Sequence, residues 1–338
     1  MSEKMRIGVL APPWNKVPPD NYGGTERIVD ILCRGYAAAG HEPILFASGD
    51  STTPVQHEHI IAEARMPPDK YQEHVHLAHF IKRANELSLD MVHSHLEAIQ
   101  PYAGMLPCPV VCTMHVEITS ERERFLRRNK AVHYVSISRN HSQKFPMPVE
   151  FIRHGLEIEK FPCTEEADHY LFFIGEISER KGADTAARVA RELGIPLKIA
   201  GPVKPGTELW FEREVIGLGS GMEIQHLGPL GFEDKVALMG RAMAVLCPVR
   251  WDEPFGLVAV EAMACGTPVV AMARGSFPEL IEDGVTGFLC ENEDEFLDKV
   301  PQTRELDRFC CHDRMLELFD HQRMVDEYLT LFVRLLNS

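Results

Sequence analysis

The segment Arg250–Val270 reads RWDEPFGLVAVEAMACGTPVV and is the most informative stretch of the chain. Two glutamates in it, Glu253 and Glu261, are separated by seven residues. Because proline already has a helix-compatible φ, we expect a helix to begin at Pro254. Glu261 then lies two turns along nearly the same face, roughly 10 Å further on at 1.5 Å per residue. The segment therefore predicts a helix that starts just after one carboxylate and carries the other.

The start of such a helix is a site for an anion. It presents unpaired N–H groups, at Phe255, Gly256 and Leu257, together with about half a positive charge. Gly256 has no side chain and lets a ligand approach closely. A diphosphate is the expected ligand, with Glu253 accepting a hydrogen bond from a sugar and Glu261 from a ribose. Two glutamates at this spacing occur by chance in many helices, so the prediction depends on the whole string.

On both sides of this segment, short β-branched runs alternate with longer helical stretches, a pattern typical of parallel sheets covered by helices. In the first half, the expected helix has Thr25 as N-cap and ends before Gly40. The expected strands cover residues 6–11, 43–47, 91–93, 110–114, 131–137, 170–175, 197–200 and 244–247. The expected helices cover residues 25–39, 183–193, 232–241 and 323–336.

The length of the chain predicts two domains, because 338 residues exceed the usual domain of about 100 to 200. The polar, aperiodic segment PCTEEADH, residues 162–169, is the candidate linker. We expect an N-terminal domain over residues 1–162, a second domain over 163–320, and a helix over 321–338 that packs back on the first. Ligands bind open α/β sheets beyond the carboxyl ends of the strands, so the loops there are the expected site.

The charge distribution argues against one class of partner. Residues 1–150 hold 16 Lys and Arg against 17 Asp and Glu, whereas residues 151–338 hold 19 against 33. Nucleic acid is not expected as a partner, because binding its phosphates needs a basic surface. The one basic cluster, within Arg122–Lys130, is either a solvated helix face or a contact for an anionic membrane or acceptor. Nothing in the sequence indicates an oligomeric state.

Cysteine usage and hydropathy point to one compartment. Nine cysteines without a CxxC pair are expected to be free thiols in a reducing environment. The longest apolar stretch, residues 257–273, is interrupted by Glu261 and by Gly266–Pro268, so it is not expected to span a bilayer. The first residues also lack a signal-peptide pattern. We therefore expect a cytoplasmic protein, at the inner membrane face if the basic cluster binds lipid.

Several segments form a recognisable series along the chain: APPWNKVPPDNYGGT (11–25), the strand ending at His115, HGL (154–156), GEISERKG (175–182), EPFGLVAVEAMACGTPVVA (253–271) and GSFPELIEDGVTG (275–287). In this order they resemble glycosyltransferase family 4, a family of retaining enzymes with the GT-B fold. The resemblance extends over nearly the whole chain. It implies two Rossmann-like α/β domains whose parallel sheets face a central cleft, with a nucleotide-sugar donor on the second domain and an acceptor mainly on the first.

For the second domain, the resemblance assigns the donor contacts residue by residue. Glu253 matches the glutamate that contacts the donor sugar, and Glu261 the one that holds the ribose hydroxyls. The amides of Phe255, Gly256 and Leu257 match those that face the phosphates. Lys181 matches a lysine that neutralises the leaving phosphates, although an exposed lysine at a helix start is otherwise unremarkable.

For the first domain, the resemblance assigns residues that meet the donor when the cleft closes. Gly23 and Gly24 match a glycine loop that contacts the diphosphate, with a plain turn as the alternative. His115 matches a histidine that lies against the donor sugar, with a buried structural histidine as the alternative.

One position departs from the family pattern. Glu176 stands where the family usually has an arginine, directly after the glycine that ends a strand. At about 4 Å, two unit charges interact by about 4 kcal/mol at an effective dielectric constant near 20, so an uncompensated carboxylate here would weaken donor binding. Either Glu176 points away from the phosphates, or another cation compensates. Arg180 and Arg250 are the candidates.

The expected activity is transfer of a hexosyl group from a nucleotide-diphosphate sugar to an acceptor hydroxyl, with no cofactor and no side-chain nucleophile. No Asp-x-Asp motif is present, which fits a metal-independent site where a helix start and Lys181 replace the cation. We expect base contacts at His226 and Gly228, with UDP-sugars favoured over GDP- and ADP-sugars. A nucleotide-sugar epimerase and a non-catalytic nucleotide-sugar binding protein are the alternatives.

Overall fold

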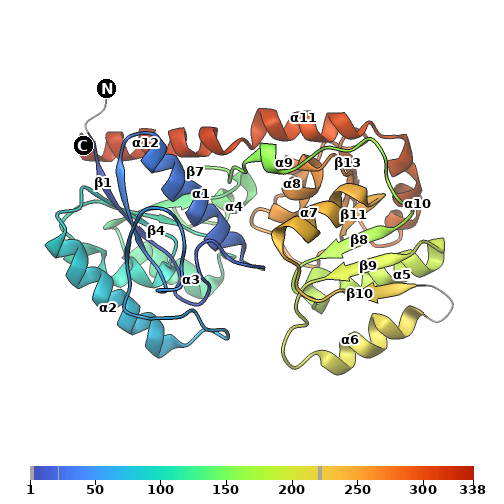
Figure 1. Cartoon of the computed structure of the whole chain (residues 1–338), viewed down its shortest axis with the longest axis horizontal. Coiled ribbons are helices and arrows are strands. Elements are labelled where there is room, and N and C mark those ends of the chain that lie inside the picture. The colour runs from blue at the N-terminus through green and yellow to red at the C-terminus, as the bar shows by residue number, and fades with distance from the viewer. Residues whose placement is uncertain (1–3, 22, 220–222) are drawn as a thin grey trace. The chain divides into compact units, whose positions relative to one another are not determined.

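The computed structural model describes residues 4–21, 23–219 and 223–338, and the chain divides into two compact units (Figure 1). Unit 1 is formed by Met1–Leu156 and His321–Ser338, and unit 2 by Glu157–Asp320. The expected division after residue 162 thus lies at residue 156. The difference arises because Phe161 packs against Phe232 of unit 2, with ring centroids 5.4 Å apart.

Unit 1 is an open parallel sheet of order β3-β2-β1-β4-β5-β6-β7. Its strands are β1 (Arg6–Leu10), β2 (Glu42–Phe46), β3 (Gln56–Glu58), β4 (Met91–Ser94), β5 (Val110–Thr113), β6 (Val132–Ser136) and β7 (Glu150–Phe151). Its helices are α1 (Gly24–Ala38), α2 (Lys70–Glu86), the 3₁₀ helix η1 (Glu97–Met105), α3 (Ser120–Arg128), α4 (Arg139–Gln143) and α12 (His321–Leu336).

Helices cover this sheet because its strands are apolar on both faces. Phe46 of β2 meets Phe80 of α2 edge to face, with centroids 4.7 Å apart. Helices α1 and α12 lie side by side (Figure 1), and a Cβ on Gly35 would stand 2.3 Å from Val325. Glycine at position 35 therefore lets the closing helix pack tightly on α1.

The start of α1 differs from the prediction. The N-cap is Gly23 and makes no side-chain cap, so Thr25 already lies inside the helix. Thr25 was expected to cap because threonine is a common N-cap, but the chain enters the helix one residue after Gly23. At the other end, Gly40 follows the helix with a φ of 90°, which confirms the predicted stop.

Unit 2 is a second parallel sheet, of order β10-β9-β8-β11-β12-β13. Its strands are β8 (Leu171–Ile174), β9 (Leu197–Ala200), β10 (Ile224–His226), β11 (Ala244–Cys247), β12 (Val269–Met272) and β13 (Gly287–Cys290). Its α-helices are α5 (Ala183–Leu193), α6 (Glu208–Glu214), α7 (Phe232–Arg241), α8 (Leu257–Ala264), α9 (Phe277–Leu280), α10 (Glu295–Gln302) and α11 (Arg308–Leu318). Its 3₁₀ helices are η2 (Ile158–Lys160), η3 (Glu179–Lys181), η4 (Ile216–Gly219) and η5 (Thr303–Glu305).

The two sheets confirm the predicted α/β class with parallel strands in each half. All nine cysteines are free thiols, as expected, and most are buried. In the part of the chain that the structure describes, no helix has the length and apolarity needed to cross a bilayer.

Candidate functional site

The predicted donor residues of unit 2 gather at the carboxyl edge of its sheet. Because all strands in this sheet are parallel, the loops that follow them emerge at one edge. Glu176 follows β8, His226 ends β10, Glu253 lies in the loop after β11, and Ser276 follows β12. The backbones approach closely here, since a Cβ on Gly201 after β9 would stand 1.9 Å from the Gly175 carbonyl oxygen.

Helix α8 begins later than predicted. It starts at Leu257, with Gly256 as its N-cap in the left-handed conformation at φ 82° and ψ 51°. Pro254 is therefore not a helical residue, because a left-handed residue cannot continue a right-handed helix from Pro254. Glycine adopts this conformation without the steric cost of a Cβ. Glu261 accordingly lies about one turn into α8 rather than two.

The start of α8 leaves backbone donors available. The amides of Gly256, Leu257 and Val258 donate no hydrogen bond to any residue that the structure describes, whereas the Ala259 amide bonds to the Gly256 carbonyl at 3.0 Å. The Phe255 ring is buried and meets the Phe319 ring edge to face. Open backbone amides thus lie at Gly256 and Leu257, as an anion site at this helix start would need, and Val258 adds one that the sequence did not indicate.

Hydrogen bonds from Ser276 to backbone carbonyls hold the loop that carries Glu253 in place. The Ser276 amide donates to the Glu253 carbonyl at 3.0 Å, and the Ser276 hydroxyl donates to the Phe255 carbonyl at 2.7 Å. A Cβ on Gly275 would stand 2.4 Å from the Glu253 nitrogen, so the two loops touch. This contact holds Glu253 directly beside the start of α8.

Lys181 and Glu253 form an ion pair, with 2.6 Å between Nζ and Oε2. The lysine ends η3, and Gly182 behind it packs so closely that a Cβ would stand 2.0 Å from the Pro248 carbonyl oxygen. The Lys181 ammonium also lies 5.0 Å from the centroid of the Trp251 ring. Both charged side chains remain partly exposed, so they are open to a ligand.

Glu261 forms a second ion pair, which the sequence did not predict. Its Oε1 lies 2.5 Å from Nζ of Lys235 on α7, and both residues are buried, at 6% and 9% exposed. Lys235 lies four positions before Met239 on the inward face of α7. A lysine on an apolar helix face was the signal that sequence reasoning missed.

The two arginines considered as partners of the phosphates differ. Arg250 donates to the carboxylates of Asp184 and Glu293, so its charge is neutralised locally. Arg180 forms no ion pair with another described residue, and its guanidinium lies 4.1 Å from the centroid of the Trp251 ring. Glu176 is half-buried and likewise has no ion-pair partner among the described residues. Of these two arginines, Arg180 is therefore the one whose charge no carboxylate among the described residues neutralises.

The residues predicted to contact a base also lie at this edge. His226 bonds through Nε2 to the Gly201 carbonyl at 3.1 Å, and the Gly201 amide bonds to the Gly228 carbonyl at 2.8 Å. The structure thus brings His226 and Gly228 together with the glycine turn after β9. The His226 ring also meets Phe211 edge to face at 4.9 Å.

In unit 1, His115 belongs to a histidine cluster that follows β4 and β5. Its Nε2 lies 2.8 Å from His95 Nδ1, and its ring stacks on His154 at 5.0 Å. Burial lowers the pKa of His115 to about 3 and lowers those of His95 and His154 well below the usual value. His115 is therefore a neutral imidazole at physiological pH, which can exchange hydrogen bonds with hydroxyls without adding charge.

The glycine loop of unit 1 adjoins a buried acid. A Cβ on Gly23 would stand 2.8 Å from Pro19 and 2.9 Å from Oε2 of Glu26, so this backbone accepts no side chain. Gly24 is the first residue of α1. Burial raises the pKa of Glu26, despite hydrogen bonds to its own backbone and to Asn15. Sequence reasoning missed Glu26, although it follows the glycine pair by two positions.

The basic cluster on α3 is partly neutralised. Arg122 forms a two-pronged ion pair with Glu97, and Arg127 pairs with Glu123 one turn earlier on the helix. These contacts favour the solvated helix face over a membrane contact. Among the described residues there is no group of three His, Cys, Asp or Glu side chains arranged to hold a metal ion.

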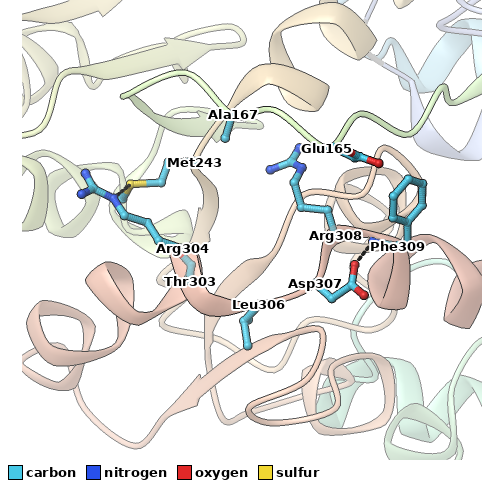
Figure 2. Close-up of a pocket in the computed structure, with 9 residues that line it drawn as sticks. All are labelled: Glu165, Ala167, Met243, Thr303, Arg304, Leu306, Asp307, Arg308 and Phe309. Carbon is cyan, nitrogen blue, oxygen red and sulfur yellow. Dashed lines mark hydrogen bonds between the residues drawn. The ribbon is translucent and has the colours of Figure 1, made fainter.

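Unit 2 also contains a cavity of about 490 Å³ that includes none of the predicted site residues (Figure 2). Its buried arginine, Arg308, donates to the carbonyls of Thr164, Gly240 and Ala242. Arg308 thus ties the segment after η2 to the end of α7. The lining residues are Glu165, Ala167, Met243, Thr303, Arg304, Leu306, Asp307, Arg308 and Phe309.

In a comparison with known proteins, each unit matches a glycosyltransferase family model. Residues 157–306 match the family described as Glycosyl transferases group 1, and residues 22–150 match Glycosyltransferase Family 4. D-inositol 3-phosphate glycosyltransferases are 32% identical over 165 residues in Mycobacterium sp. (strain JLS) and 38% over 159 residues in Mycobacterium bovis (strain BCG / Pasteur 1173P2). These matches cover 44% and 43% of this chain, and 37% and 33% of the relatives' own length.

Solved structures share the fold over almost the whole chain. AviGT4, a glycosyltransferase involved in avilamycin A biosynthesis, has a TM-score of 0.77 at 22% identity and covers 98% of both chains. The sucrose-phosphate synthase of Thermosynechococcus elongatus has a TM-score of 0.80 at 20% identity, over 98% of this chain and 99% of the other. Anabaena Alr3699/HepE, solved with UDP-glucose, has a TM-score of 0.78 at 18% identity, over 98% and 100%.

The family matches span both units, and each unit has the parallel sheet that the GT-B fold requires. The chain has the GT-B fold and belongs to glycosyltransferase family 4.

Proposed function

We propose that the protein transfers a hexosyl group from a nucleotide-diphosphate sugar to an acceptor hydroxyl, with retention of anomeric configuration. One observation supports this most strongly: open amides at the start of α8, the ammonium of Lys181 and the carboxylate of Glu253 meet at one sheet edge. Amides and an ammonium suit a diphosphate, whereas a carboxylate suits the hydroxyls of a hexose. A nucleotide-diphosphate sugar, in which a diphosphate and a hexose are covalently joined, fits this arrangement.

The contact between Lys181 and Glu253 matches the chemistry of such a donor. Their atoms lie 2.6 Å apart, so the phosphate-binding and sugar-binding groups are neighbours, as the phosphate and the anomeric carbon are in the donor. Negative charge develops on the leaving phosphate oxygen as the glycosidic bond breaks. Lys181, Arg180 and the α8 amides stabilise that charge in place of a metal ion, because they are oriented before the reaction begins.

For retention, the acceptor hydroxyl attacks from the face that the diphosphate leaves. A phosphate oxygen takes the hydroxyl proton, so no side chain becomes covalently attached. From unit 1, we propose that His115 contacts the donor sugar and that the amides of Gly23 and Gly24 contact the diphosphate. A neutral His115 suits this role, since it hydrogen-bonds a sugar without repelling the cationic character that develops at the anomeric carbon.

We propose UDP as the donor nucleotide, recognised at the turn that holds His226 and Gly228. The support is that Alr3699/HepE was solved with UDP and with UDP-glucose. For the acceptor, the matching curated relatives are named for D-inositol 3-phosphate, which makes phosphorylated polyols the first acceptors to assay.

The decisive experiment incubates the protein with UDP-, GDP- and ADP-sugars, with and without a panel of acceptors that includes inositol 3-phosphate. Nucleotide release and product mass are measured, and NMR determines the anomeric configuration of the product. Acceptor-dependent release with a glycosylated product of retained configuration is expected, at an unchanged rate in EDTA. Rearranged sugar without an acceptor would instead identify an epimerase, and tight binding without turnover a binding protein in which Glu176 has disabled the phosphate site.

A further inference from the structure

Helices α7 and α8 are joined by a buried ion pair whose role the proposed reaction does not explain. Lys235 comes from the first turn of α7 and Glu261 from the second turn of α8. Their charged atoms are 2.5 Å apart. A buried ion pair adds little net stability compared with apolar packing, because both ions lose their hydration. Stability alone is therefore a weak reason for charges at these two positions.

The pair leaves half of the carboxylate available. Lys235 engages Oε1 of Glu261, whereas Oε2 has no hydrogen-bond partner within residues 4–21, 23–219 and 223–338. The ammonium is itself confined, since it lies 5.3 Å from the centroid of the Phe232 ring. Glu261 is also on the helix whose first amides are open. One oxygen is thus fixed by the protein, and the other is free to accept hydrogen bonds from a ligand.

The ion pair with Lys235 fixes the position of the Glu261 carboxylate, which is the group that would accept hydrogen bonds from a ligand. Hydrogen bonds from ligand hydroxyls to a carboxylate are charge-assisted and about twice as strong as neutral ones. We propose that Lys235 is a positioning residue that holds the free Oε2 of Glu261 oriented toward the ribose diol, and so sets the preference for ribonucleotides. This inference rests on the proposed function.

The test compares two ligands that differ only in the diol. Isothermal titration calorimetry first identifies which of UDP, GDP and ADP the wild-type protein binds most tightly. That nucleotide and its 2′,3′-dideoxy analogue are then titrated into wild type and into Lys235→Met, which keeps an aliphatic stem without the charge. Lys299→Met is the matched control, because Lys299 in α10 also lies over a ring, Phe288 at 5.1 Å, in the same unit.

The expected result is specific to the diol. Wild type prefers the ribonucleotide at least tenfold, and Lys235→Met reduces that preference about tenfold while leaving affinity for the dideoxy analogue unchanged. Lys299→Met keeps the wild-type ratio of the two affinities. Equal losses for both ligands, or an unchanged ratio, would show a purely structural ion pair.

A double variant keeps the inference testable if Lys235→Met does not fold. Lys235→Met together with Glu261→Gln removes both charges and preserves shape, which buried pairs often tolerate. A diol preference equal to that of wild type in this protein would overturn the inference. If the wild-type protein binds none of the three nucleotides, the proposed function fails instead, so the two failures are distinguishable.

Discussion

Lys181 is the residue whose removal tests the phosphate site most directly. We expect Lys181→Ala to lower nucleotide diphosphate affinity at least tenfold, because it removes a cation and leaves Glu253 as an unpaired carboxylate beside the phosphates. Calorimetric titration measures the change, and Lys299→Ala serves as the control on the same unit. Nucleotide binding as tight as that of wild type would contradict the assignment of Lys181.

The charge of Glu176 is the second prediction at this scale. Glu176 has no ion-pair partner among the described residues, so replacing it by arginine removes a repulsive charge from the sheet edge that carries Lys181. We expect Glu176→Arg to preserve or improve donor affinity. A clear loss of affinity, measured by the same titration, would show that the carboxylate itself holds the ligand.

Arg180 and Arg250 are expected to respond differently to substitution. Arg180→Gln removes the unpaired cation and should weaken nucleotide binding severalfold with little change in melting temperature. Arg250→Gln removes the partner of Asp184 and Glu293, so it should lower the melting temperature with a smaller effect on affinity. Calorimetric titration and thermal melting of both variants test this difference. If Arg250→Gln lost more affinity and Arg180→Gln more stability, Arg250 would be the ligand-binding arginine and Arg180 the structural one.

Single residues were easier to predict than their partners. Glu253, Glu261 and Lys181 are predicted site residues because they stand in short strings with recognisable neighbours, and their roles stay predictions. Their ion pairs join segments that are 72 and 26 positions apart in the chain. Only packing decides which helix faces which, so the sequence indicated the carboxylates but not the lysine that holds Glu261.

At the scale of elements, α8 depends on the conformation of one residue. Gly256 is left-handed, and a Cβ there would also stand 3.2 Å from Leu280 and from Phe277. We expect Gly256→Ala to destabilise the protein by roughly 1–2 kcal/mol and to weaken nucleotide binding, because the α8 amides shift. The control is Gly194→Ala at the left-handed end of α5, with nothing within 4 Å of its Cβ.

The Gly194→Ala control separates the effect of backbone strain on stability from an effect on nucleotide binding. Gly194→Ala should lower stability in urea denaturation while leaving nucleotide affinity unchanged. If both variants lose stability and neither loses affinity, the start of α8 does not bind the ligand.

Elements were predicted best where local signals agreed. The helices over Ala183–Leu193 and Phe232–Arg241 and the strands over Leu197–Ala200 and Ala244–Cys247 have the predicted bounds. In these segments the apolar period is clear and glycine or loop residues flank the ends. The predicted start of α8 was wrong because proline favours a helix start, whereas the glycine two positions later adopts a turn conformation before the helix begins.

For the whole molecule, the alternation of strands and helices was enough to predict two parallel sheets. It could not predict the order of the strands, because that order depends on crossover connections between segments distant in sequence. The unit boundary was likewise misplaced by six residues, since burial of Phe161 against Phe232 has no local signal.

The pH dependence of stability is the prediction that belongs to the whole molecule. Burial lowers the pKa of His93 and His115 to about 3 and of His76 and His141 to about 4. An unfolded histidine titrates near 6.5, so the unfolded chain binds protons first as the pH falls. The free energy of unfolding is therefore highest above pH 6.5 and falls progressively toward pH 4. Each buried histidine lowers it by up to about 2 kcal/mol by pH 5.

These histidines all belong to unit 1, so the loss is expected in one unfolding transition only. Trp14 lies in unit 1, whereas Trp210 and Trp251 lie in unit 2, which allows each unit to be followed by fluorescence. A Trp210→Phe/Trp251→Phe protein reports on unit 1, and a Trp14→Phe protein on unit 2. In urea titrations at pH 7.5 and 5.0, the midpoint reported by Trp14 should fall much further than the one reported from unit 2. Equal shifts in the two proteins would mean that the buried histidines do not govern acid stability.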